Sequence, residues 1–141
     1  MKLTRTISET RSRIGELTRN GRDLGFVATM GALHKGHISL VRESLEDNDV
    51  TVVSIFVNPT QFAAGEDFDS YPRSLERDKL RLKTAATDLI FAPETTTMYP
   101  FGIENATVVS VPGLTENFCG ASRPGHFDGV TTVVARLFAL V

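Results

Sequence analysis

Two histidines, His34 and His37, are the residues whose type and spacing most directly suggest chemistry. They stand in the segment MGALHKGH, residues 30–37, with Gly36 between them. If this segment opens a helix, its unpaired backbone N–H groups and the positive end of the helix dipole favour an anion. Gly36 would let a phosphate approach the backbone closely, and two imidazoles could donate hydrogen bonds to a phosphoryl group. We therefore expect a phosphate-binding site here.

Two other interpretations of the histidine pair stay open. The histidines could be ordinary surface or capping residues, because an isolated H-x-x-H pair is not a specific signal. They could also bind a metal ion with His126 as the third ligand, although no cysteine or carboxylate partners stand at ligand spacing. The position of the pair between a predicted strand and a predicted helix favours nucleotide binding, and we predict no metal site.

A second group of polar side chains follows the most apolar segment of the chain. Asn58 and Gln61 come directly after residues 50–57. Asn-Pro is a common turn signal, so a simple turn is the alternative. At the ligand edge of a sheet, the two amides could bind the hydroxyl and carboxylate of a small hydroxy acid. We expect His34 and His37 to face Gln61 across one shared cavity.

Two further segments combine charge with glycine and proline. Residues 65–73 hold three acids, and we expect a solvated loop there that could act as a lid. Residues 123–130 place Arg123 and His126 before an apolar helix, which suits either an anion-facing turn or a structural connector. Cys119 is the only cysteine, and no paired base stands near it, so we expect it to pack rather than to act as a nucleophile.

Alternating strands and helices must position these segments. Apolar β-branched runs predict strands at 24–30, 50–57, 88–92 and 107–111. Apolar residues at helical spacing predict helices at 4–20, 36–47, 72–86 and 127–141, with loops at 61–71 and 113–126. The residues that carry the helical spacing, and that we expect on the inner faces, are Ile7, Ile14, Leu17, Ile38, Val41, Leu45, Leu75, Leu80, Leu82, Val130, Val133, Val134, Leu137 and Phe138.

The alternation predicts an α/β fold in which helices flank a parallel sheet. In such sheets ligands bind at the carboxyl ends of the strands, which is where both polar segments stand. A chain of 141 residues is most simply one compact domain.

Composition excludes several classes of function. The formal net charge of −2 gives no global field that would attract nucleic acid or an anionic membrane. No apolar run approaches the roughly 20 residues that span a bilayer, and the first residues lack the apolar region of a secretory signal. A single cysteine fits a reducing compartment, so we expect a cytoplasmic protein.

Four motifs resemble those of one enzyme family. Residues 34–37, HKGH, resemble the HIGH-type signature of nucleotidyl-transferring enzymes, and the longer MGALHKGH closely resembles the version found in pantothenate synthetases. FVNPTQF at 56–62, YPR at 71–73 and RPGHFDGV at 123–130 are similar to stretches of the same family, in the same order. The resemblance runs from about Leu24 to Val141. It implies a Rossmann-like three-layer sandwich with a mainly parallel sheet.

The resemblance also implies roles for individual residues. His34 and His37 would be catalytic, through contacts with ATP phosphates. The other ATP-binding positions would be Met30, Gly31 and Gly36. Pantoate would be bound by Met30, Gln61, Val133 and Val134. Asn58, Gln61 and Tyr71 would lie near β-alanine, and Arg123 would be a possible anion contact.

The reaction implied by this family is the ATP-dependent ligation of pantoate and β-alanine. A pantoyl adenylate forms first with release of pyrophosphate, and attack by the amine then gives pantothenate and AMP. ATP would enter with Mg²⁺ as a substrate complex, without a tightly bound cofactor, and the protein would be a homodimer. Family members continue well beyond the position of Val141. We therefore expect residues 1–141 to be a truncated catalytic domain that lacks the C-terminal domain and has weak or no activity alone.

Two rival functions stay open. One is a different HIGH-type nucleotidyltransferase, such as a cytidylyltransferase-like enzyme. FVNPTQF argues against it, since this segment suits a small acid better than a second nucleotide. The other is a non-catalytic nucleotide-binding module or a dimerisation fragment.

Overall fold

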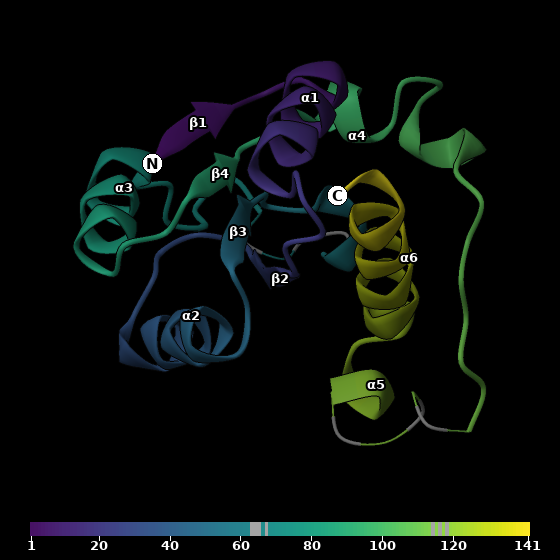
Figure 1. The fold of residues 1–141 in the computed structure, drawn as a ribbon. Helices are drawn as coiled ribbons and strands as arrows, with labels where there is room; N and C mark the ends of the chain where they lie inside the picture. The colour runs from purple at the N-terminus through teal and green to yellow at the C-terminus, as the bar shows by residue number, and fades with distance from the viewer. Residues whose placement is uncertain (63–65, 67, 114, 116, 118) are drawn as a thin grey trace.

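A four-stranded parallel sheet organises the computed structural model, which describes residues 1–141 except 63–65, 67, 114, 116 and 118. The strands are β1 (Lys2–Thr4), β2 (Leu24–Thr29), β3 (Val50–Ile55) and β4 (Leu89–Phe91). Their order in the sheet is β1-β4-β3-β2, and all neighbouring strands are parallel (Figure 1). The carboxyl ends of the strands therefore lie at one edge.

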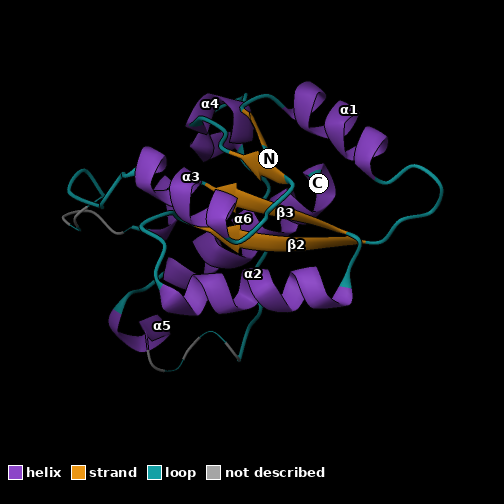
Figure 2. Ribbon diagram, turned by 60° about the vertical axis from the view of Figure 1, so that its left-hand side comes forward, coloured by secondary structure: helices purple, strands orange, loops and turns teal. Residues whose placement is uncertain are grey.

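Helices cover both faces of the sheet. The long helices are α1 (Ile7–Leu17), α2 (Lys35–Asp47), α3 (Leu75–Thr84) and α6 (His126–Leu140). Helices α2 and α3 pack against one face, and α1 and α6 pack against the other. Figure 2 shows α1 and α2 on opposite sides of β2 and β3. The predicted three-layer α/β fold with a parallel sheet is confirmed.

Strand β3 is central because its side chains are apolar toward both layers. Val53 packs into the cluster under α2 and α3, which also contains Val41 and Leu82. Val52 points the other way and packs with residues of α1, including Ile14. Successive strand residues face opposite sides, so a nearly continuous apolar run suits a strand covered twice.

The remaining described helices are short. They are the single-turn segments η1 (Pro59–Gln61), α4 (Thr95–Met98), η2 (Ile103–Asn105) and α5 (Cys119–Ser122). Segment η1 follows β3 closely, and Asn58 and Gln61 stand at its two ends. Among the described residues, no helix has both the length and the apolar character needed to cross a bilayer.

The first predicted helix begins three residues too early. Lys2–Thr4 form strand β1, in which Thr4 stands opposite Phe91. The helix starts only after Thr6, whose side chain accepts a hydrogen bond from the backbone N–H of Glu9 while the Glu9 carboxylate bonds back to the Thr6 N–H. This reciprocal cap satisfies the first free N–H groups of the helix and fixes where it begins.

The predicted strand at 107–111 is wrong. In the structure this extended segment joins no sheet and runs along the outer side of α6, at the right of Figure 1. The Val109 N–H donates to Thr132 Oγ1 at 2.9 Å, and the Thr131 hydroxyl donates to the Val109 carbonyl. Its backbone groups therefore bond helix side chains in place of a neighbouring strand.

Most of the predicted inner positions are buried or half-buried, with two exceptions. Leu80 is 66% exposed and Phe138 is 64% exposed, so both predictions are wrong. Leu82, two positions after Leu80, is fully buried and supplies the inward contact of α3. The expected packing of Cys119 is also wrong, because this residue is exposed.

Candidate active site

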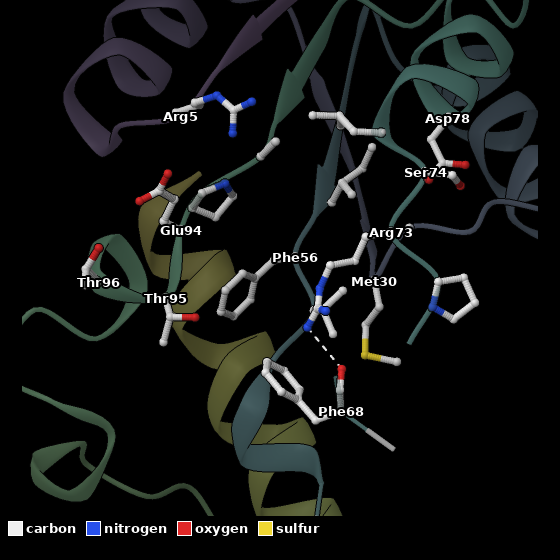
Figure 3. Close-up of a pocket in the computed structure, with 17 residues that line it drawn as sticks. Arg5, Met30, Phe56, Phe68, Arg73, Ser74, Asp78, Glu94, Thr95 and Thr96 are labelled. Atoms are coloured by element: carbon white, nitrogen blue, oxygen red, sulfur yellow. Dashed lines mark hydrogen bonds between the residues drawn. The ribbon is translucent and has the colours of Figure 1, made fainter. Parts of the chain in front are cut away.

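A cavity of about 540 Å³ opens at the carboxyl edge of the sheet. Its wall includes the four residues that directly follow the strands, namely Arg5, Met30, Phe56 and Ala92. This is the position where parallel α/β sheets bind ligands, and the volume suits a small molecule. Figure 3 shows Phe56 and Met30 projecting into this space from neighbouring strands. We call it the edge cavity.

The edge cavity combines an apolar wall with two arginines. Met30 and Phe56 supply apolar surface, while Arg5 and Arg73 supply positive charge. The Arg73 guanidinium donates to the Phe68 carbonyl at 3.0 Å, and its Cζ lies 4.9 Å from the centroid of the Phe68 ring (Figure 3). Arg73 is thus held over the cavity by the loop before α3. A small organic acid could place its hydrocarbon part against the apolar side chains and its carboxylate near an arginine.

The histidine pair forms the N-terminal cap of α2. Nδ1 of His34 accepts a hydrogen bond from the Gly36 N–H at 3.1 Å, and Nδ1 of His37 accepts one from the His34 N–H at 3.3 Å. The ring centroids lie 4.0 Å apart. In a neutral imidazole whose Nδ1 accepts, the proton is on Nε2. Both rings therefore keep an Nε2–H that can donate to a ligand at the start of the helix.

The electrostatic surroundings keep His37 neutral. Partial burial lowers the pKa of His37, and the neighbouring His34 lowers it further, while Asp78 acts in the opposite direction. A neutral ring preserves Nδ1 as the acceptor for the His34 N–H. The lowered pKa of His37 thus favours a ring that donates through Nε2–H without carrying a charge.

Gly36 has a structural role beside the predicted ligand role. A Cβ at this position would lie 3.0 Å from Cε1 and 3.2 Å from Nδ1 of His34. Because the Gly36 N–H is also bonded to that ring, the absence of a side chain makes room for the imidazole. The approach of a phosphate to Gly36 stays a prediction.

Asn58 lies at the centre of a buried hydrogen-bond network after β3. It is 1% exposed, and its Nδ2 donates to Gln61 Oε1 at 3.1 Å and to the Gly129 carbonyl at 3.1 Å. Its Oδ1 accepts from the Tyr99 hydroxyl at 2.9 Å. The network ties η1 to α6 and to the end of α4. Asn58 therefore fixes the position of Gln61, whereas its contact with β-alanine stays a prediction.

Gln61 borders a second, smaller cavity of about 110 Å³, which Arg123 and His126 also line. The Gln61 carbonyl accepts a hydrogen bond from the Arg123 guanidinium at 3.1 Å, and it lies 2.8 Å from Nδ1 of His126. The Arg123 guanidinium is paired with both carboxylate oxygens of Glu66 at 2.6 Å, which raises its pKa. Any anion at Arg123 would have to compete with that carboxylate.

Three other predicted site residues lie in packed surroundings. Val133 is buried in the cluster that includes Phe56 and Leu137, and Val134 packs against the same cluster. Tyr71 is half-buried, with its ring edge-on to Phe62 at a centroid distance of 5.9 Å. Their contacts with pantoate and β-alanine stay predictions. Gly65 and Asp67 of the predicted lid lie outside the described residues.

The structure groups some of the predicted residues and separates others. Met30 and Gly31 line the edge cavity, and Gln61 lines the cavity with Arg123. His34 lines a third space of about 680 Å³ between α2 and α3. None of these three cavities is lined by both a histidine of the pair and Gln61, so the expected shared cavity is not found among them. Within the described residues, no group of three or more His, Cys, Asp or Glu side chains is placed to hold a metal ion.

Several residues at the site have no motif in the sequence to mark them. Arg5 and Ala92 are found only by noting that they directly follow strands, and β1 itself was not predicted. Asp78 and Tyr99 contact the two motifs from distant positions, at sequence separations of 46 and 41. Burial is the feature that distinguishes Asp78 from the other acid of its helix. The sequence carries no signal for it, because burial is decided by the fold.

Comparison with known proteins places the chain in a family. The family profile described as pantoate-beta-alanine ligase matches residues 2–141. The chain is 51% identical to a pantothenate synthetase of Alteromonas mediterranea and 55% identical to one of Geotalea uraniireducens, in both cases over 141 residues. These alignments cover 100% of the chain but 50% and 49% of the two relatives, so the chain spans about half their length.

Solved structures agree with the sequence comparison. A pantothenate synthetase from Thermus thermophilus matches with a TM-score of 0.90 and 52% identity, over 100% of this chain and 49% of the other. A pantoate-beta-alanine ligase from Francisella tularensis, described as complexed with beta-gamma ATP and beta-alanine, matches with a TM-score of 0.91 and 40% identity, over 99% of this chain and 53% of the other. Because the profile and these relatives cover nearly all of its residues, the chain belongs to the pantoate–β-alanine ligase family.

Proposed function

We propose that this chain forms the ATP- and pantoate-binding part of an enzyme that ligates pantoate to β-alanine. The observation that carries the proposal is the histidine cap of α2, which follows a strand whose next residue, Met30, lines the edge cavity. A group of hydrogen-bond donors suited to a phosphate and a pocket suited to a small acid thus lie at the same edge of the sheet. Residues 1–141 would then belong to one Rossmann-like catalytic domain.

In the first step, a carboxylate oxygen of pantoate attacks the α-phosphorus of ATP. A P–O bond forms, the bond to pyrophosphate breaks, and the electron pair leaves with pyrophosphate. The Nε2–H groups of His34 and His37 would donate to phosphate oxygens as negative charge shifts toward the leaving group. No protein nucleophile is required, because the substrate carboxylate itself attacks.

In the second step, the amine of β-alanine attacks the acyl carbon of pantoyl adenylate. The C–N bond forms, the bond between the acyl carbon and the AMP oxygen breaks with its electron pair leaving on AMP, and the proton released by the amine passes to water. The contribution proposed for the protein in this step is to hold the two substrates within reach of each other. Asn58, Gln61 and Tyr71 are proposed to lie near the incoming amine, with Gln61 held in place by its hydrogen bond from Asn58.

Pantoate combines two methyl groups with hydroxyl and carboxylate groups, so its site must offer both kinds of surface. Met30 and Phe56 in the edge cavity would receive the methyl groups, and Val133 and Val134 are proposed to complete the apolar wall behind Phe56. Gln61 lines the smaller cavity with Arg123, so its proposed role in holding the carboxylate for attack on ATP requires pantoate to reach both cavities. A site assembled from several strand ends can read such a small ligand with few polar contacts.

Mg²⁺ is expected to arrive with the triphosphate. The described residues offer no dedicated magnesium site, and each oxygen of the buried Asp78 carboxylate already accepts a backbone N–H. Proteins commonly bind magnesium through substrate phosphates with few side chains, so this donor set is compatible with an ATP complex.

We also propose that the protein is a cytoplasmic homodimer. Phe101 is 82% exposed and Val108 is 64% exposed, in a stretch that also includes the partly exposed Ile103. Exposed apolar patches mark interaction sites, and these side chains are the proposed contact between two copies of the chain. Light scattering during gel filtration should give twice the chain mass, and Val108→Asp should shift it toward the monomer. A monomeric wild-type chain would contradict the dimer without affecting the proposed chemistry.

The test of the function is pantoate-dependent exchange of labelled pyrophosphate into ATP, together with titration calorimetry of ATP and pantoate. The Thermus thermophilus pantothenate synthetase serves as the positive control for exchange. It is about twice as long as this chain, which covers 49% of it. We expect this chain to bind both ligands and to exchange weakly. Gln61→Ala should abolish pantoate binding and leave ATP binding intact, whereas Asn105→Ala, which removes an exposed amide, should change neither.

The same titrations separate the rival functions. Another nucleotidyltransferase, or a non-catalytic nucleotide-binding module, would bind ATP without any effect of pantoate. That outcome, or pantoate binding that survives Gln61→Ala unchanged, would contradict the assignment. Absence of ATP binding in the wild-type chain would contradict the role of the histidine cap.

A further inference from the structure

We infer that Asp78 is a positioning residue for the histidine cap, acting through the turn between β2 and α2. This inference rests on the proposed function, because the cap is the proposed phosphate site. Asp78 belongs to α3, is 1% exposed, and lies at the wall of the edge cavity (Figure 3). Its Oδ2 accepts the Ala32 N–H at 2.8 Å, and its Oδ1 accepts the Leu33 N–H at 2.9 Å.

The turn needs such a clamp because its backbone is unusual. Gly31 and Ala32 have φ values of 82° and 49°, and the left-handed region is unfavourable for a residue with a Cβ such as Ala32. A Cβ on Gly31 would also lie 3.1 Å from Asp78 Oδ2. Two hydrogen bonds to one ionised carboxylate are strong and directional. They orient the N–H groups of Ala32 and Leu33 so that each donates to a different oxygen of the Asp78 carboxylate.

The clamp is one residue away from the cap. Leu33, whose N–H is bonded to Asp78, is fully buried and immediately precedes His34. The His34 N–H in turn donates to Nδ1 of His37, so a rotation of the turn would move both rings. The negative charge of Asp78 raises the pKa of His37 and so opposes the lowering of that pKa by burial. Asp78 therefore orients the turn that precedes the pair and partly offsets the lowering of the His37 pKa.

The helix α3 offers a matched control for the loss of an acid. Glu76 lies two positions before Asp78, is exposed, and pairs with Lys79 at 3.0 Å. Glu76→Gln removes one negative charge from the same helix without touching the turn. Asp78→Asn keeps the shape of the side chain, but it removes the charge and turns one acceptor into a donor that faces an N–H.

The first measurement is amide hydrogen exchange by NMR on the whole chain without nucleotide. In Asp78→Asn, exchange at Ala32 and Leu33 should accelerate by roughly tenfold or more, the effect expected from losing a charge-assisted hydrogen bond. The imidazole of His37 should titrate at lower pH than in the wild type. Glu76→Gln should leave both readouts unchanged. Wild-type values in Asp78→Asn, or equal changes in both variants, would overturn the inference.

A second variant separates the geometry from the charge. Ala32→Gly removes the penalty for the left-handed backbone. In the double variant Asp78→Asn/Ala32→Gly, Mg-ATP affinity should recover most of the loss seen in Asp78→Asn, while the titration of His37 stays displaced. A purely structural acid would give no such rescue, and its absence in a folded double variant contradicts a role through the turn.

The wild-type chain gives a test that needs no substitution if Asp78→Asn fails to fold. On acidification, the amide shifts of Ala32 and Leu33 should follow the carboxyl ¹³C shift of Asp78, and independent midpoints would contradict the clamp. These NMR readouts do not depend on nucleotide. A wild-type chain that shows the clamp but binds no ATP would therefore refute the proposed function and leave the inference about Asp78 standing.

Discussion

The imidazole rings of His34 and His37 lie with their centroids 4.0 Å apart and their planes tilted by 40°, and each ring accepts a backbone N–H from the start of the same helix. The alternative interpretation of these histidines as capping residues is therefore correct as far as it goes. It does not exclude the proposed role in phosphate binding. Capping through Nδ1 fixes the tautomer and leaves Nε2–H free of the helix backbone, so the cap prepares the donors that a phosphate would use.

The first prediction concerns the pH dependence of stability. The pKa of His37 is lowered in the folded chain, so the unfolded state binds a proton at higher pH than the folded state does. Its contribution to the free energy of unfolding is therefore fully present above the usual pKa near 6.5 and is lost as the pH falls through the lower, folded pKa. Urea unfolding of the wild type at several pH values between about 7.5 and 5 should show this decline.

His37→Gln supplies the comparison for that measurement. Glutamine at the third helical position can still accept the N–H of the capping residue, but it does not titrate. The difference between the wild-type and His37→Gln curves should thus shrink as the pH falls below the usual histidine range. Parallel curves over the whole range would show that His37 does not link proton binding to folding.

The second prediction concerns Gly36. An alanine Cβ at this position would press on the His34 ring at 3.0 Å and displace it from the cap. Loss of the cap should lower the free energy of unfolding by about 1 kcal/mol. Gly36→Ala should also weaken ATP binding, because one of the two Nε2–H donors moves. Chemical denaturation and calorimetry on the same preparation measure both effects.

Gly15 offers the matched control for Gly36→Ala. It lies inside α1, and nothing stands within 4 Å of a Cβ built there. Gly15→Ala should therefore raise stability by roughly 0.5–1 kcal/mol through helix propensity and should not alter ATP binding. Equal stabilisation by both substitutions would mean that the His34 ring tolerates the added methyl group.

The third prediction uses the two tyrosines of the chain. The Tyr99 hydroxyl donates to the buried Oδ1 of Asn58 at 2.9 Å, so Tyr99→Phe should cost about 1 kcal/mol of folding free energy. Tyr71 is half-buried and its ring packs on Phe62, so Tyr71→Phe should be close to neutral. Thermal unfolding monitored by circular dichroism compares the two. A neutral Tyr99→Phe would show that the Asn58 network does not depend on this donor.

The fourth prediction concerns the contact between α6 and η1. A Cβ on Gly129 would collide with the Thr60 carbonyl oxygen, which is backbone and cannot rotate away. Gly129→Ala should thus push α6 from η1 and cost about 1–3 kcal/mol, more than the gain in helix propensity. The bond from Asn58 to the Gly129 carbonyl would lengthen, so pantoate affinity should fall as well. Gly15→Ala again serves as the control for a helical glycine.

The sequence by itself determined the elements whose patterns are local. The β-branched run of β3 identifies a strand covered on both faces, since few other structures bury consecutive side chains. The strand, glycine and helix order around residues 24–47 favoured a nucleotide-binding helix start, because each of these signals lies within a few residues of the next. The likeness to nucleotidyl-transferring enzymes came from the motif HKGH at residues 34–37. The segment at 107–111 failed for the complementary reason. β-propensity measures how a side chain fits a sheet, and whether a neighbouring strand exists is not a local property.

Only the tertiary structure decided how the site is held and which charges line it. Asp78 reaches the turn at Ala32 across 46 positions, and Tyr99 reaches Asn58 across 41. Arg5 reaches the edge cavity because it follows β1, which pairs with β4 at one side of the described sheet. Strand β2, which precedes the histidine pair, lies at the opposite side. Contacts at such separations leave no periodic trace along the chain, because they depend on where the layers pack. The sequence thus marks the residues proposed to contact a ligand, while packing selects the residues that hold them in place.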